Sequence, residues 1–119
     1  MAGTTGIQNA LTVYFTQTAA GAANNDYTLT RPGTVVDCWA IARANQAGGT
    51  FQLLNTAAAI TDAMNVSVDL VKTSAGTISD TNYAVIAGSI LRCQTVGAAT
   101  LVDACITLVA PVANSTAVV

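Results

Sequence analysis

Two of the residue types on which enzymes depend most are missing from this chain. It contains neither histidine nor glutamate, and its few charged side chains are Asp26, Arg31, Asp37, Arg43, Asp62, Asp69, Lys72, Asp80, Arg92 and Asp103. General acid–base catalysis near neutral pH relies mainly on histidine, and then on carboxylates whose pKa values are shifted by their surroundings. The composition therefore excludes Ser-His-Asp and Cys-His nucleophilic sites, and we predict a protein without enzymatic activity.

Motifs for cofactors and metals are missing as well. The sequence has no Gly-rich phosphate loop, no calcium-binding loop and no CxxC pair. Its three cysteines, Cys38, Cys93 and Cys105, are widely spaced, and no positively charged signal segment precedes them. We therefore predict three reduced and mostly buried thiols, no cofactor and no bound metal.

Charge and hydropathy argue against two classes of partner. The four basic residues occur singly in a chain of net charge −2, whereas binding to nucleic-acid phosphates needs clustered Lys and Arg. No apolar run reaches the roughly 18 residues that a membrane-spanning helix requires. We expect no nucleic-acid partner, no membrane partner, and synthesis in a cytoplasm.

The residues that are abundant favour β-structure. Hydrophobic residues make up 52% of the chain but aromatic residues only 5%, which predicts a core of Ala, Val, Ile and Leu. Apolar and polar residues alternate in residues 11–16, 66–72 and 101–109, a pattern typical of strands with one buried face. The side chains expected to point inward are Leu11, Val13, Phe15, Val66, Val68, Leu70, Val102, Ala104, Ile106 and Leu108.

Turn-forming residues such as Pro32-Gly33 separate these strands at short intervals. The Ala-rich residues 56–64 are too few for an independent helix, so we predict a loop or a short strand there. About eight short strands without a long helix predict an all-β fold, an antiparallel β-sandwich with jelly-roll or related Greek-key topology. This domain would span residues 10–110, between an N-terminal arm (1–9) and a C-terminal tail (111–119).

Residues 34–44 are apolar on both faces of an expected strand. Strict alternation places Val36, Cys38, Ala40 and Ala42 on one face, and Val35, Asp37, Trp39, Ile41 and Arg43 on the other. We predict a central strand with one face in the core and the other against another element or subunit. Asp37 and Arg43 would then form a buried or interfacial polar pair.

A second buried face is favourable, because each Å² of apolar area removed from water contributes about 25 cal/mol. Closed rotational symmetry provides such a face in every copy, so we predict a homo-trimer, or a subunit bound within a lattice of other subunits, and not a free monomer. The candidate interface residues are Tyr14, Tyr27, Asp37, Trp39 and Arg43. Packing on a sheet face, or a sugar-binding surface, are alternative roles for the aromatic residues.

Three segments of the sequence are similar to a known family. They are residues 32–42 (PGTVVDCWAIA), 59–64 (AITDAM), and 75–80 (AGTISD) leading to 87–92 (AGSILR). They resemble small structural proteins of tailed bacteriophages, in particular head decoration or cement proteins. The resemblance covers roughly Thr34 to Val109.

This resemblance implies a β-rich trimeric protein that clamps neighbouring subunits of the major capsid protein from outside. It would be made in the host cytoplasm and would end on the surface of the virion. No catalytic residue comes with the family. A head-fibre or host-recognition module, a capsid-building jelly roll and a lectin-like binding module are alternatives that share the same composition.

Overall fold

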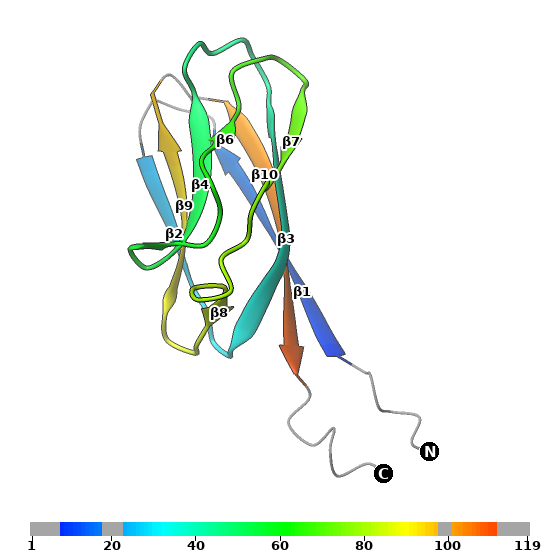
Figure 1. Cartoon of the computed structure of the whole chain (residues 1–119), viewed down its shortest axis with the longest axis vertical. Helices are drawn as coiled ribbons and strands as arrows, with labels where there is room; N and C mark the ends of the chain where they lie inside the picture. Colours follow the sequence, from blue (N-terminus) through cyan, green and yellow to red (C-terminus); the bar gives the residue numbers. More distant parts are fainter. Residues whose placement is uncertain (1–7, 18–22, 98–100, 112–119) are drawn as a thin grey trace.

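The computed structural model describes residues 8–17, 23–97 and 101–111, which fold into a β-sandwich (Figure 1). None of these residues belongs to a helix, so they include no helix that would be long and apolar enough to cross a membrane. The strands are β1 (Gln8–Gln17), β2 (Ala23–Thr28), β3 (Gly33–Ala42), β4 (Thr50–Asn55), β5 (Ala58–Ala59), β6 (Met64–Asn65), β7 (Lys72–Ser74), β8 (Ala84–Val85), β9 (Ile90–Val96) and β10 (Val102–Pro111).

The strands form two antiparallel sheets. Sheet A has the order β1-β10-β3-β7, with β8 also paired to β3, and sheet B has the order β2-β9-β4-β5, with β6 also paired to β4. The antiparallel pairs are nested, because β1 pairs with β10, β2 with β9, β3 with β7 and β8, and β4 with β5 and β6. This nesting is that of a jelly roll. The predicted all-β sandwich is confirmed.

The strands begin and end close to the predicted domain limits. β1 begins at Gln8 and β10 ends at Pro111, and these two residues pair with each other at one end of sheet A. The expected arm therefore contributes its last two residues to β1, and the expected tail contributes Pro111 to β10. The rest of the arm and of the tail lies outside the described residues.

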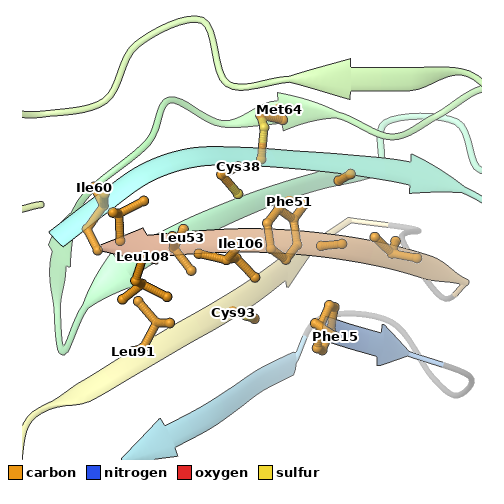
Figure 2. Close-up of a cluster of buried hydrophobic side chains, with 14 of the residues drawn as sticks. Phe15, Cys38, Phe51, Leu53, Ile60, Met64, Leu91, Cys93, Ile106 and Leu108 are labelled. Atoms are coloured by element: carbon orange, nitrogen blue, oxygen red, sulfur yellow. The ribbon is translucent and has the colours of Figure 1, made fainter. Parts of the chain in front are cut away.

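Small and medium-sized apolar side chains from both sheets fill the space between them (Figure 2). The largest are Phe15 of β1 and Phe51 of β4, whose ring centroids lie 5.6 Å apart. The alternation in residues 101–109 is confirmed, since Val102, Ala104, Ile106 and Leu108 are all buried. In β1 the same pattern holds, although exposure increases from Phe15 to Leu11. Residues 56–64 contain the short strand β5 and the start of β6, as predicted.

The predicted strand at residues 66–72 is wrong. Only its last residue, Lys72, is in a strand, and of the three side chains expected inside only Val66 is buried. Residues 66–71 form a loop across the end of β3, where the Leu70 amide donates a hydrogen bond to the carbonyl of Ala42 (2.8 Å). Leu70 has a positive φ of 60° and is 71% exposed. The sequence of residues 66–71 alternates like a strand. The Leu70 amide, however, pairs with the end of β3 and not with a partner in a regular strand ladder.

A buried glutamine holds the start of the same loop. The Gln46 side-chain amide donates to the carbonyl of Val66 (2.8 Å), and its backbone amide donates to the carbonyl of Ser67 (2.8 Å). The side-chain oxygen of Gln46 accepts a hydrogen bond from the Leu101 amide (2.9 Å). Such side chain–backbone bonds satisfy loop groups that a strand would pair with another strand.

β3 is a central strand, as predicted, but a β-bulge changes which of its side chains point inward. The register with β10 shifts between Thr107, which pairs with Asp37, and Leu108, which pairs with Val35, so that Val36 has no partner on β10. Val35 is fully buried and Val36 is 49% exposed, the reverse of the strict alternation predicted for this end of the strand. Bulges insert one residue in this way and bend the strand locally.

The bulge can be tested with two adjacent valines. Val35→Ala removes buried methyl groups and should lower the free energy of unfolding by about 2 kcal/mol. Val36→Ala, the matched control, should change it by less than about 0.5 kcal/mol. Urea denaturation of both variants measures the difference. Equal losses, or a larger loss for Val36→Ala, would show that the register shift is misplaced.

The three cysteines are buried and none forms a disulfide, as predicted. Cys38 of β3 and Cys93 of β9 face the core from opposite sheets (Figure 2). Burial raises the pKa of both thiols, that of Cys93 to about 12. In the folded protein these thiols stay protonated at pH values where a free cysteine ionises.

This difference predicts a loss of stability at alkaline pH. Above a pH of about 8.5 the unfolded Cys93 thiol ionises while the folded one does not, so the unfolded state gains an advantage that grows until the folded pKa is reached. The slope is about 1.4 kcal/mol per pH unit for each such thiol. In urea denaturation between pH 8 and 11, Cys93→Ala should show a shallower decline than the parent protein. Parallel pH profiles for the two proteins would contradict the raised pKa.

Candidate functional site

The outer face of sheet A carries an exposed apolar and aromatic surface. The strand registers place Tyr14 of β1, Cys105 of β10 and Trp39 of β3 side by side in one row. Tyr14 is 73% exposed, because its neighbours Val13 and Phe15 point inward and alternation turns it outward. We call the outward side chains of Tyr14, Val36, Trp39 and Ile41 the Tyr14/Trp39 face.

Trp39 is held in place on this face by its neighbours. The ammonium group of Lys72, on the adjacent strand β7, lies 4.9 Å from the centroid of the indole ring. This distance is within the range of a cation–π interaction. Cys105 is buried although it lies on the outer side of the sheet, since Tyr14 and Trp39 flank it on the two adjacent strands. Tyr14 is therefore the aromatic side chain that a partner would meet first.

Asp37 lies at the bulged end of the Tyr14/Trp39 face and is exposed next to Val36. The bulge is the reason that these two successive residues both face solvent. The sequence pattern placed Asp37 and Trp39 on one face of the strand, which is the outer one, but put Val36 on the opposite face, because no residue type in the segment marks the extra position. Its neighbour Val35 has the same side chain and the opposite environment.

Arg43 pairs with a different carboxylate from the one predicted. Its Nε atom lies 3.0 Å from Oδ2 of Asp103, and its Nη2 atom donates a hydrogen bond to the backbone carbonyl of Gln17 (2.6 Å). Asp37 is six residues away along an extended chain, a separation of about 20 Å at 3.3 Å per residue. The predicted Asp37–Arg43 pair is therefore wrong. Arg43 instead joins β10 and the end of β1 beside the Tyr14/Trp39 face.

Tyr27 also lies elsewhere than on this face. Its ring packs against the core from β2, and its hydroxyl donates a hydrogen bond to the backbone carbonyl of Tyr14 (3.2 Å). Partial burial raises the pKa of the Tyr27 phenol. The residue connects the edge strands of the two sheets, and its contacts explain its position without an external partner.

The outer face of sheet B has a different character. The Arg92 guanidinium makes two hydrogen bonds to the carboxylate of Asp26 (2.8 and 3.0 Å), which lower the pKa of Asp26. Gln94 donates to the side-chain oxygen of Asn24 (3.1 Å) in the next row. These polar groups are paired with one another across the strands. This face is therefore a weaker candidate for binding a partner than the Tyr14/Trp39 face.

A groove of about 540 Å³ opens between the edge strands of the two sheets. It is lined by Leu11 and Val13 of β1 and by residues 27–31 from β2 and the turn after it. Its walls are mainly apolar, with Arg31 at one end. Across the part of the chain that the structure describes, no three Cys or Asp side chains gather to hold a metal ion.

Comparison with known proteins does not assign a role to any of these surfaces. No protein-family model, no curated protein and no solved structure matches the chain. The Tyr14/Trp39 face is the candidate functional site, because it combines the exposed aromatic side chain of Tyr14 with the exposed or half-buried side chains of Val36, Trp39 and Ile41.

The Arg43 assignment predicts different effects for two aspartates near this face. Asp103→Asn removes the charge next to Arg43 and should lower the free energy of unfolding by about 1 kcal/mol, a modest value because both groups are partly solvated. Asp37→Asn is the control and should change it by less than about 0.5 kcal/mol. Thermal or urea denaturation compares them. A larger loss for Asp37→Asn would restore the original pairing.

Proposed function

We propose that the protein is a non-enzymatic structural component of a virus particle, a decoration protein that binds the outside of the major capsid lattice and stabilises it. The observation that carries this proposal is the Tyr14/Trp39 face, the outer surface of a sheet with an aromatic residue 73% exposed. Such a surface is suited to contact with another folded protein, since aromatic side chains are enriched in protein–protein interfaces.

The fold is compatible with this role but does not decide it. Jelly rolls occur in viral capsid proteins and also in lectins and other binding domains. A fold by itself does not imply a function. The argument in favour of a capsid surface comes from the resemblance of residues 34–109 to decoration proteins, together with the face that Val36, Trp39 and Ile41 form with Tyr14 of β1.

The distribution of charge supports a protein partner. Only 8% of the residues are charged, and on the face Asp37 and Lys72 accompany the uncharged side chains of Tyr14, Val36 and Ile41. A low charge density gives little long-range attraction to a polyanion. These properties fit a partner that presents a large, regular protein surface and binds through shape complementarity.

A second apolar surface supports self-association. The loop at residues 66–71 exposes Val68, Leu70 and Val71 beside the end of β3. A protein that clamps a lattice needs one surface for the lattice and another for its own copies. In this proposal the protein forms a trimer, the smallest closed ring that matches a threefold position of a shell.

A lectin-like host-recognition module is the second candidate, because Tyr14 and Asp37 lie on the same exposed face. Sugar rings stack on open aromatic faces and donate hydrogen bonds to carboxylates. Lys72 lies over the ring of Trp39 at 4.9 Å, however, which leaves the indole less open to a sugar. This contact favours a protein partner over a glycan.

The proposal predicts that Tyr14→Ala weakens binding to capsid shells. Purified shells of the encoding virus, stripped of decoration protein, would be mixed with the recombinant chain and sedimented. Loss of a central aromatic contact should reduce affinity at least about tenfold, and the shells should lose their added thermal stability. Folding should be preserved, since Tyr14 packs little of its side chain against the rest of the protein.

Val96→Ala is the matched control for that experiment. Val96 is 46% exposed but lies on β9, on the outer face of sheet B, so its loss should leave binding unchanged. Equal binding by Tyr14→Ala and the parent protein would contradict the assigned face. Binding to a glycan array that Tyr14→Ala abolishes, with no affinity for shells, would favour the lectin-like module.

A further inference from the structure

β1 is a long edge strand without the usual protection. It borders sheet A on one side, and its pairing with β10 runs from Gln8 to Gln17 without a register shift. Sheet edges are commonly protected against further pairing by charged residues, proline, bulges or short strands. β1 has ten residues, no charge, no proline and no bulge. β7 and β8, on the other side of sheet A, have three and two residues.

The direction of the free backbone groups on β1 follows from two hydrogen bonds. The Tyr14 carbonyl accepts a hydrogen bond from the Tyr27 hydroxyl, so it points away from β10. β3 lies on the other side of β10, and there the Arg43 amide donates a hydrogen bond to the carbonyl of Leu101. The Leu101 carbonyl therefore points toward β3 and away from β1. Because backbone groups alternate in direction along a strand, both observations predict the same result: Ala10 and Thr12 direct their N–H and C=O groups toward the free edge.

The open part of this edge is its first half. Tyr27 covers the edge at Tyr14, whereas Figure 1 shows the Gln8 end of β1 running with β10 beyond the rest of the sandwich. Leu11 is 39% exposed there, and with Val13 it lines one wall of the 540 Å³ groove. Backbone groups that no described strand pairs with and exposed apolar side chains therefore lie next to each other.

We infer that this edge pairs with the same edge of a second copy of the chain. Antiparallel pairing of β1 with β1 places Ala10 opposite Thr12 of the second copy and Thr12 opposite its Ala10. Leu11 then faces Leu11 of the second copy across a twofold axis. The backbone groups that point outward on one copy meet the corresponding groups on the other, which makes the contact isologous.

The composition of β1 favours a second copy over a different partner. Like charges facing each other across two strands destabilise their pairing, and β1 has none. Leu11 gains an apolar partner of equal size, and the added strand covers the open side of the groove. The contact joins two copies, so it does not build a trimer but would link neighbouring trimers. It holds whether or not the proposed capsid function is correct.

Amide hydrogen exchange tests the pairing directly. Within a single copy no described residue pairs with the amides of Ala10 and Thr12, whereas those of Leu11 and Val13 point to β10. Raising the concentration of the intact chain should therefore slow exchange at Ala10 and Thr12 and leave Leu11 and Val13 unchanged. Fast exchange at Ala10 and Thr12 at every concentration would overturn the inference. Protection that does not depend on concentration would do so too, because it would mean that the chain covers its own edge.

A disulfide crosslink tests the register. Residues opposite each other in a non-hydrogen-bonded antiparallel pair have Cα atoms about 4.5 Å apart, which a disulfide can bridge. Mild oxidation of Leu11→Cys should give a covalent dimer in several-fold higher yield than Val96→Cys. Val96 is the control because it is similarly exposed, at 46%, on the outer face of sheet B. Equal yields would overturn the register.

A backbone variant separates the contact from the fold. Thr12→Pro removes an N–H group that points to the free edge and is not bonded to β10, so the domain should still fold. In the Leu11→Cys background it should abolish the crosslink, whereas Thr12→Val, which keeps the N–H group, should not. Undiminished crosslinking with Thr12→Pro would show that β1 does not pair through its backbone. A failure of shell binding in these variants would affect only the capsid proposal.

Discussion

The ladder between β3 and β10 is the contact on which both the core and the candidate surface depend. These strands are neighbours at the centre of sheet A, and side chains alternate between its two faces. Inward they supply Cys38, Ala40 and Ile106 to the core, and outward they supply Trp39 and Cys105. The bulge at Val36 decides which side chains in the first part of β3 are buried and which are exposed. Moving the register by one residue would exchange the buried and exposed sets.

Much of the fold could be predicted from the sequence, because one buried face leaves a period of two in the chain. The pattern around Phe15 and from Val102 to Leu108 is of this kind, and both segments are strands. The sequence reasoning was wrong where partners distant in the chain decide the structure. Residues 66–71 alternate like a strand, but bonds to Ala42 and Gln46 hold them as a loop.

The candidate site was predicted in part for the same reason. Tyr14 and Trp39 do face outward, since they alternate with side chains that point inward, and Asp37 faces outward beside the bulged residue Val36. Arg43 could not be assigned a partner, because its neighbour Asp103 lies on a strand that is sixty residues further along the chain. Tyr27 was grouped with the others by residue type, whereas the side of β2 on which it lies depends on how the two sheets meet.

The position of Trp39 has a practical consequence for work on this protein. It is the one tryptophan in the chain, it is half-buried on the candidate surface, and a lysine ammonium lies over its ring. Indole emission depends on solvation and on nearby charge, so the intrinsic fluorescence of the protein originates beside Tyr14 and Ile41. Any event that covers or rearranges this face has a built-in optical reporter, and no dye has to be attached to the surface under study.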